Sequence, residues 1–123
     1  MKVKVNFQKK IIIQNTSKEE LVFQTNGILQ NNVLSFIDNE QVVNVITLKL
    51  PMVIIERKGE IHSFLTFEQN KTTTLLLKTN FGNLSIDIYT HKLRYENSKL
   101  EIIYDVVETN DENKTYELNI ELK

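Results

Sequence analysis

The sequence contains no cysteine, no tryptophan and no alanine, and it has one proline and three glycines in 123 residues. Without cysteine, the chain has no disulfide, no thiolate metal ligand and no cysteine nucleophile. Without alanine, it lacks the residue with the highest helix propensity. A chain of this length buries roughly two thirds of its unfolded surface, so a hydrophobic core alone can stabilise it.

An excess of charge of one sign is also missing. The 15 basic and 16 acidic residues give a net charge of −1 and are interspersed along the chain. Because a nucleic-acid surface needs a basic excess or stripe, we expect no nucleic-acid partner. No apolar run approaches the roughly 18 residues of a membrane span, and the apolar triplet 11–13 is too short for a signal peptide. We therefore expect a cytoplasmic protein without a membrane association.

Alternation of apolar and polar residues runs through the chain from end to end. Near the start, Val3, Val5 and Phe7 alternate with lysine and asparagine, which places one set of side chains on each face of a strand. β-Branched residues are frequent, and turn residues follow at short spacing. The sequence predicts strands over residues 2–13, 20–29, 33–37, 42–50, 52–57, 60–67, 72–79, 84–95, 99–108 and 116–122.

Short connections and one buried face per strand define the fold class. Antiparallel neighbours joined by short turns favour an up-and-down meander, and closing the sheet removes its exposed edges. We expect a single all-β domain over residues 1–123, an antiparallel and mostly up-and-down barrel of about eight to ten strands. Gly27, inside an apolar strand, predicts a bulge or a close backbone approach.

Several short motifs occur in a characteristic order along the second half of the chain. They are Arg57 with Gly59, then Phe67, then Thr79 with Phe81 and Gly82, then Ile88 with Thr90. With these motifs the chain resembles the YwiB-like family of uncharacterised bacterial proteins. The resemblance implies a calycin-like β-barrel, similar to the lipocalin architecture, and it implies no established activity.

The segment Asn80-Phe81-Gly82-Asn83 resembles a functional loop, but its context predicts a hairpin corner. A phosphate-binding loop would need more glycines and a helix N-terminus after it, whereas an alternating strand follows here. We expect Gly82 to adopt a positive φ and Phe81 to cap the barrel.

Three residues are candidates for binding a ligand: Arg57, Thr90 and Tyr104. Arg57 shares the register of the inward residues Val53 and Ile55, so it can anchor an acidic head group. Alternatively, it closes the barrel by donating to loose carbonyls, or by stacking on an aromatic ring. Thr90 and Tyr104 lie in phase with inward apolar residues, and their hydroxyls need partners, for which mutual hydrogen bonding is the simpler expectation.

No catalytic or metal-binding pattern accompanies these residues. His62 and His91 are the two histidines, and they lie far apart in the sequence without a close carboxylate pattern. His91 is out of phase with the inward residues and is expected to face solvent unless a bulge intervenes. No nucleophile–base pair is visible, so we expect no enzyme, no metal and no cofactor.

Two functional hypotheses stay open at this point. In the first, the barrel mouth holds a small, mostly apolar or acidic ligand, with Arg57, Thr90 and Tyr104 as its polar contacts. In the second, the barrel is filled and the protein forms a homodimer or docks on a protein partner. The apolar segment 42–50 is then the candidate surface. An interior cavity much larger than one water molecule, with Arg57 at its rim, would favour the first hypothesis.

Overall fold

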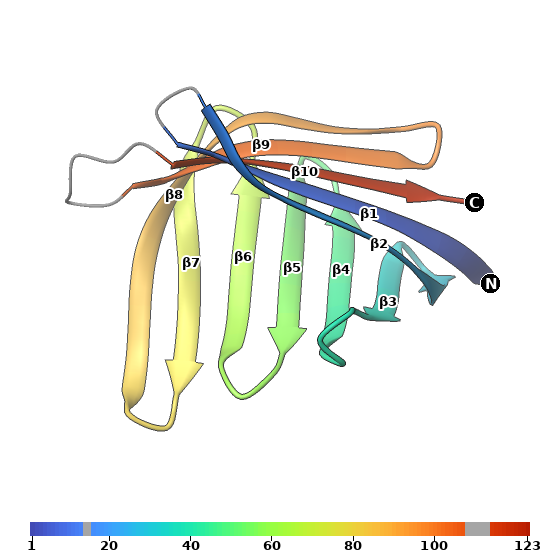
Figure 1. Cartoon of the computed structure of the whole chain (residues 1–123), viewed down its shortest axis with the longest axis horizontal. Coiled ribbons are helices and arrows are strands. Elements are labelled where there is room, and N and C mark those ends of the chain that lie inside the picture. Colours follow the sequence, from blue (N-terminus) through green and yellow to red (C-terminus); the bar gives the residue numbers. More distant parts are fainter. Residues whose placement is uncertain (14–15, 108–113) are drawn as a thin grey trace.

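The computed structural model describes residues 1–13, 16–107 and 114–123. Their ten strands form a closed antiparallel barrel in which every strand pairs with its neighbours in the sequence, and β1 closes the circle with β10 (Figure 1). The strands are β1 (Lys2–Ile13), β2 (Thr16–Gln30), β3 (Val33–Ile37), β4 (Val43–Lys49), β5 (Met52–Lys58), β6 (His62–Glu68), β7 (Thr72–Thr79), β8 (Gly82–Glu96), β9 (Lys99–Val107) and β10 (Lys114–Leu122). The predicted all-β, up-and-down barrel is confirmed.

The predicted strand ends agree closely with those of the structure, and one turn differs clearly. β2 begins at Thr16, so most of the turn predicted at 14–19 is strand. The turn predicted at 109–114 lies almost entirely outside the described residues. No helix that could cross a membrane is formed by the residues that the structure describes.

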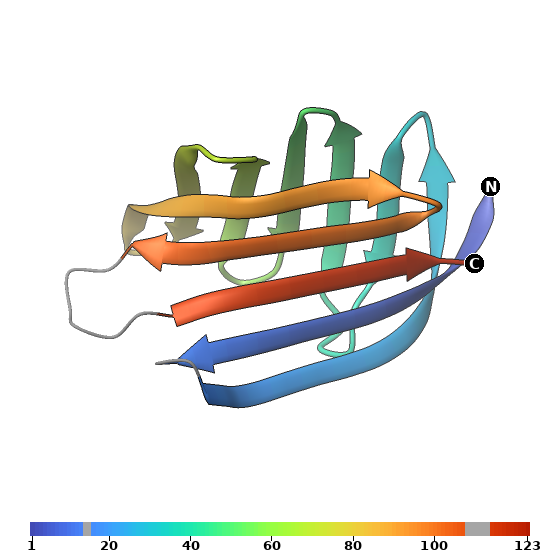
Figure 2. The ribbon, with the colours of Figure 1, turned by 90° about the horizontal axis from the view of Figure 1, so that it is seen from above.

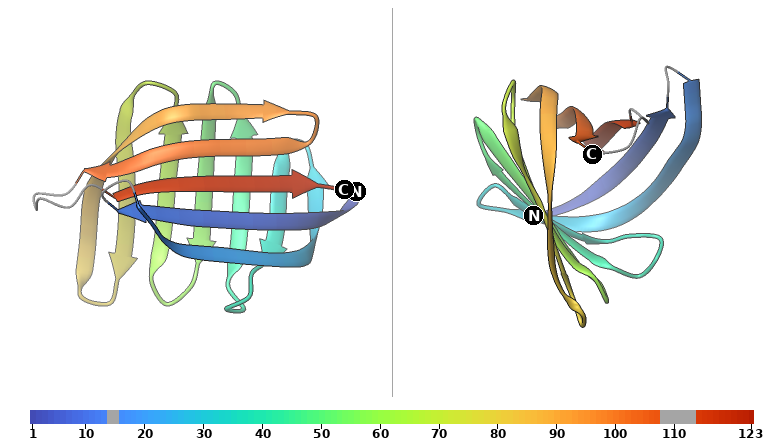
Figure 3. Two further views of the ribbon diagram at one scale, coloured as in Figure 1. Left: turned by 45° about the horizontal axis from the view of Figure 1, so that its top comes forward. Right: turned by 90° about the vertical axis from the view of Figure 1, so that its left-hand side faces the viewer.

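The barrel is flattened into two layers whose strands cross at a steep angle (Figures 2 and 3). Strands β3 to β7 form one layer, and β1, β9 and β10 lie in the other (Figure 1). The two 15-residue strands, β2 and β8, bend from one layer into the other. In β8 the pairing with β9 shifts between Thr90 and Lys92, a β-bulge of the kind that lets a strand turn a corner.

Gly27 lies on β2 where this strand passes from β1 to β3. A Cβ atom at this position would lie 2.9 Å from Val5 Cγ2 and 3.0 Å from the backbone oxygen of Ser35. The close backbone approach predicted for Gly27 is therefore confirmed, and no larger residue fits without a shift of the neighbouring strand.

The inward side chains of both layers form a continuous apolar core. Its fully buried members include Phe67, Ile46, Ile88, Ile102, Ile120, Val5 and Val53. Three further phenylalanines gather between β1, β2 and β3: the ring centroids of Phe7 and Phe23 are 4.6 Å apart, and Phe36 lies 6.3 Å from each. The alternation read from the sequence thus places one face of each strand in this core.

The corner between β7 and β8 has the predicted backbone but a different role for its aromatic residue. Gly82 has a φ of 124°, as expected for a tight turn. The hydroxyl of Thr79 donates to the carbonyl of Gly82 and accepts from the N–H of Phe81. Phe81 is fully exposed, at 101%, so the prediction that it caps the barrel is wrong. The hairpin extends past the crossing layer (lower left in Figure 1), which leaves no core for Phe81 to cover.

Candidate functional site

Arg57 lies near the end of β5 and binds an acidic residue of the loop between β3 and β4. Its Nη2 and Nε atoms donate to Asp38 Oδ2 at 2.8 and 3.3 Å, and Nη2 lies 3.4 Å from Glu40 Oε2. Arg57 is 40% exposed, whereas Asp38 is only 8% exposed. The guanidinium is therefore held by a carboxylate that is nearly buried.

Asp38 organises the loop between β3 and β4. Its Oδ1 accepts from the backbone N–H groups of Glu40 and Val42, at 2.9 and 3.1 Å. Its Oδ2 accepts from Asn44 Nδ2 at 2.9 Å, in addition to the contact with Arg57. Burial raises the pKa of Asp38, but the donors from Asn44, Val42, Arg57 and Glu40 outweigh it and hold the pKa below its usual value.

These contacts show that Arg57, on β5, holds the loop between β3 and β4 in place. The donors of Arg57 go to Asp38 and Glu40, and no described contact stacks it on Phe67 or Phe81. An acidic ligand at Arg57 would have to share the guanidinium with Asp38 and Glu40. The sequence carries one sign of this arrangement, because an aspartate at the start of a loop commonly accepts from the backbone N–H two residues further on.

Thr90 and Tyr104 face each other across β8 and β9, deep in the core. Thr90 is fully buried, and Tyr104 is 6% exposed. Tyr104 packs on Phe67 at 4.9 Å and stacks on Tyr116 at 5.1 Å between ring centroids. Burial, and then the nearby Tyr116, raise the pKa of the Tyr104 hydroxyl. No hydrogen bond among the described residues joins either residue to Arg57.

The hydroxyl of Thr90 has no hydrogen-bond partner within the described part of the chain. The expected mutual bond with Tyr104 is therefore not formed. A buried hydroxyl without a partner costs stability, because it has lost its bonds to water and gained none.

Replacing this hydroxyl by a methyl group is expected to stabilise the protein. We expect Thr90→Val to raise the free energy of unfolding by about 1 kcal/mol, measured by urea denaturation. Thr73→Val is the matched control, because the Thr73 hydroxyl donates to the Thr66 carbonyl and its loss should destabilise. If both variants were destabilised equally, the Thr90 hydroxyl would be satisfied after all.

The barrel interior is filled. Among the described residues, a void between the layers has a volume of about 10 Å³, which is about the minimum for one water molecule. Its lining is almost entirely apolar and does not include the three candidate residues: Leu34, Ile46, Leu48, Tyr95, Leu100, Ile120 and Leu122. Arg57, Thr90 and Tyr104 therefore do not line a common cavity.

Both histidines have carboxylate partners on the outer surface, which the sequence pattern did not predict. His62 Nε2 lies 2.5 Å from Glu56 Oε2, and His91 Nε2 lies 2.7 Å from Asp105 Oδ2. Thr115 donates to the other oxygen of Asp105 and not to the imidazole, so the three side chains lack the order of a catalytic triad. No group of three metal-ligating side chains occurs among residues 1–13, 16–107 and 114–123.

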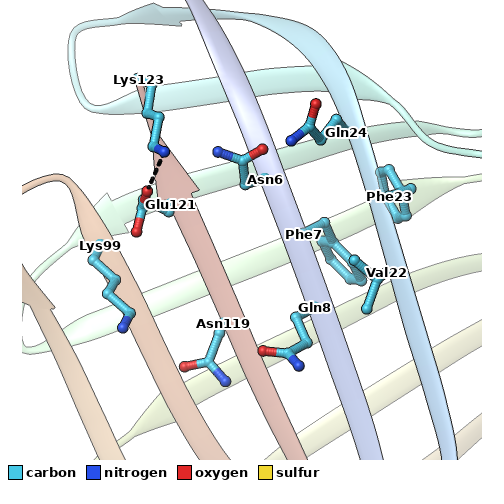
Figure 4. Close-up of a pocket in the computed structure, with 10 residues that line it drawn as sticks. All are labelled: Asn6, Phe7, Gln8, Val22, Phe23, Gln24, Lys99, Asn119, Glu121 and Lys123. Atoms are coloured by element: carbon cyan, nitrogen blue, oxygen red, sulfur yellow. Dashed lines mark ion pairs between the residues drawn. The ribbon is translucent and has the colours of Figure 1, made fainter.

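Two neighbouring grooves on the outside of the barrel share Lys123 in their lining. One, of about 500 Å³, crosses β10, β1 and β2 and is lined mainly by amide side chains and by the ion pair between Lys123 and Glu121 (Figure 4). The side chains of Asn6, Gln8 and Asn119 lie along it (Figure 4). The second groove lies beside it over β1 to β4 and is more apolar.

Comparison with known proteins agrees with this geometry. The sequence pattern of the domain of unknown function DUF1934 matches residues 5–120. The chain belongs to the DUF1934 family. A solved structure, the ywiB protein from Bacillus subtilis, superimposes with a TM-score of 0.67 at 14% sequence identity, over 98% of this chain and 90% of that one. No curated protein matches the sequence.

Membership of DUF1934 identifies the fold and leaves the function open. The ywiB structure shares the barrel, and at this identity the likeness concerns the architecture alone. A function for this DUF1934 chain therefore has to be argued from its own surface and interior.

Proposed function

We propose that this DUF1934 barrel is a non-enzymatic interaction protein that forms a homodimer through its β7–β8 hairpin. The observation that carries the proposal is the contrast between a filled interior and a fully exposed phenylalanine. The void between the layers has a volume of about 10 Å³, whereas Phe81 is 101% exposed at the tip of the hairpin. A phenylalanine held clear of the fold contributes nothing to the core, and aromatic residues are enriched at protein interfaces.

The hairpin presents an apolar surface at one end of the layer formed by β3 to β7. Leu84 is 55% exposed and pairs across the hairpin with Leu77. Ile61, in the turn beside it, is 54% exposed and precedes His62, which pairs with Lys78. The hairpin extends beyond the crossing strands (Figure 1), so these side chains are accessible to another molecule.

The tip is also preorganised. The Thr79 hydroxyl bonds to both Phe81 and Gly82 within the turn. No heavy atom lies within 4 Å of the position that a Cβ at Gly82 would occupy. The bonds of Thr79 fix the backbone of the turn, so binding costs the rotamer freedom of Phe81 but little backbone freedom.

A second copy of the chain is the partner that the charge pattern supports. Residues 79–86 contain no charged side chain, and the net charge of the chain is −1. Two copies therefore meet here with little electrostatic repulsion. A symmetric contact between two hairpins is the simplest arrangement for two identical copies.

The proposal includes a cytoplasmic location and the absence of catalysis. The lack of cysteine supports the location, since no disulfide calls for an oxidising compartment. The missing triad order at His91 supports a non-enzymatic role.

Sedimentation velocity over a range of protein concentrations tests the dimer. The unaltered protein is expected to dimerise, and Phe81→Ser is expected to raise the dimer dissociation constant about thirtyfold, the effect of losing a hot-spot side chain worth about 2 kcal/mol. Val22→Ser is the control, because Val22 is 64% exposed on β2, and it should leave the dimer unchanged. A monomer at every concentration, or a dimer that Phe81→Ser does not weaken, would contradict the proposal.

A further inference from the structure

The second outer groove lies over β1 to β4 and has a volume of about 880 Å³. Side chains of Ile28, Ile37 and Val43 form its apolar floor, with exposed fractions of 54%, 50% and 37%. Three lysines lie along it: Lys2, Lys4 and Lys123. These six residues are called the lysine groove below.

The apolar floor arises because outward-facing positions on neighbouring strands are occupied by apolar residues. Ile37 pairs with Val43 across β3 and β4, and Ile28 pairs with Ser35 across β2 and β3. Ile37 alternates with the buried Leu34 and Phe36 along β3, and Val43 precedes the buried Asn44 on β4, so both side chains point outward. Ile28 on β2 is also exposed. Three neighbouring strands thereby present a contiguous apolar surface to solvent, which is a feature that commonly marks a binding site.

The lysines gather at the other side of the same groove. Lys4 and Lys123 lie opposite each other, because each backbone N–H donates to the other residue's carbonyl, at 2.8 and 2.9 Å. Lys2 pairs with Ile28 and adjoins the floor. Like charges directly opposite on neighbouring strands destabilise a sheet, so this arrangement costs stability.

Little negative charge offsets these lysines. Lys123 Nζ lies 3.2 Å from Glu121 Oε1. Within the described residues, neither Lys2 nor Lys4 forms an ion pair with a carboxylate. The groove therefore offers positive charge beside apolar surface, and its complement is a molecule with an anionic head and an apolar tail.

We propose that the lysine groove binds one amphiphilic anion of the long-chain carboxylate class. The carboxylate lies between Lys4 and Lys123, and the hydrocarbon chain crosses Ile28, Ile37 and Val43. Three strand spacings separate β1 from β4, so the path is roughly 14 Å long, which suits an extended alkyl chain. The groove volume of about 880 Å³ lies within the range of small-molecule sites, about 300–1,000 Å³.

A polypeptide fits the lysine groove less well. An extended peptide gains most of its affinity from main-chain hydrogen bonds to a strand edge. Under the apolar floor, Gly27 and Ile28 of β2 and residues 33–36 of β3 already pair on both sides. Affinity must therefore come from apolar contact and from charge, which a fatty-acid-like molecule supplies.

Titration of the isotope-labelled protein, followed by amide NMR, tests the site with three probes of equal chain length below their micelle concentrations. Dodecanoate is expected to bind saturably and to shift the amides of Ile28, Ile37, Val43 and Lys4. Dodecyl maltoside should bind more weakly, and dodecyltrimethylammonium most weakly, because its head has the charge of the lysines. Added salt should weaken the binding of dodecanoate and leave the binding of the maltoside unchanged.

Two variants separate the apolar and the charged contributions. Ile37→Asp places a carboxylate in an exposed part of the floor and is expected to weaken dodecanoate at least about tenfold. Val107→Asp is its matched control, because Val107 is 53% exposed on β9, outside the groove, and it should not alter binding. The double variant Lys2→Gln, Lys4→Gln is expected to weaken dodecanoate about tenfold and dodecyl maltoside hardly at all.

Several results would overturn the inference. The first is that dodecanoate does not bind saturably, and the second is that the cationic probe binds with equal affinity. The third is that the amide shifts are centred on Phe67 and Tyr104 in the core. Pelleting with phosphatidylglycerol vesicles at the same affinity would show that the surface binds a membrane instead. Loss of the dimer in Ile37→Asp would show that a second copy covers the groove. The site is independent of the proposed hairpin dimer, so Phe81→Ser should bind dodecanoate with unchanged affinity.

Discussion

Replacing Asp38 with alanine is expected to lower the free energy of unfolding by about 3 kcal/mol. The Asp38 carboxylate is 8% exposed and accepts from two backbone N–H groups, from Asn44 and from Arg57. Its removal leaves buried donors without acceptors, and each such donor costs about 1–3 kcal/mol. The contribution of Arg57 is discounted, because this side chain is 40% exposed and water can replace its partner.

Chemical denaturation of Asp38→Ala measures this loss, and Glu40→Ala is the matched control. Glu40 belongs to the same loop and lies 3.4 Å from Arg57, but it is 69% exposed. Its removal should change stability by less than about 0.5 kcal/mol. Equal losses in the two variants would mean that Arg57 attracts the loop through general charge, and not through the hydrogen bonds of Asp38.

The same carboxylate gives the stability a defined pH dependence. The pKa of Asp38 in the folded protein lies below its ordinary value of 3.8, so the folded state favours the ionised form. The stabilisation is therefore fully present above the unfolded pKa of about 3.9, and it is lost as the pH falls through the lower folded pKa. We expect Asp38→Ala to show a flatter stability profile than the unaltered protein below pH 4 or so, in acid denaturation followed by circular dichroism.

The strands could be predicted from the sequence because the period of two is locally encoded. Val3 and Val5 on β1, or Leu100 and Ile102 on β9, lie on the buried face that alternation gave them. Closure of the barrel and the order of its strands followed from short turns and the need to cover edges. The exposure of Phe81 could not be predicted in this way. It depends on how far the β7–β8 hairpin extends past the crossing layer, and no local sequence pattern encodes that distance.

The candidate site was harder to predict than the fold. The alternation of inward and outward side chains along a strand predicted that Arg57, Thr90 and Tyr104 face inward. The burial of Thr90 and Tyr104 agrees with this prediction. This alternation does not show how far along the barrel axis a residue lies, or which side chain it contacts. Arg57 meets Asp38, 19 residues earlier, and that pairing depends on the fold of a loop.

Truncation of the Phe67 side chain is expected to open a cavity in the core that can hold a small apolar ligand. Phe67 is fully buried and packs on Tyr104. We expect Phe67→Ala to lower the free energy of unfolding by about 3–5 kcal/mol, and to open an apolar cavity that binds benzene. Phe81→Ala is the control with the same substitution at a fully exposed position, and it should leave the stability of the monomer nearly unchanged, measured below the dimer dissociation constant. Phe67→Leu, with a smaller cavity, keeps the test available if the alanine variant does not fold.

Binding of benzene distinguishes a filled barrel from one that is merely closed. Unaltered protein should not bind it in the interior, because a void of about 10 Å³ cannot hold a benzene ring. Phe67→Ala should bind it, with shifts in the NMR signals of Tyr104, whose ring packs on Phe67. If the unaltered protein gave the same shifts, the core would open readily to apolar ligands. The interior would then compete with the lysine groove as the binding site of this barrel.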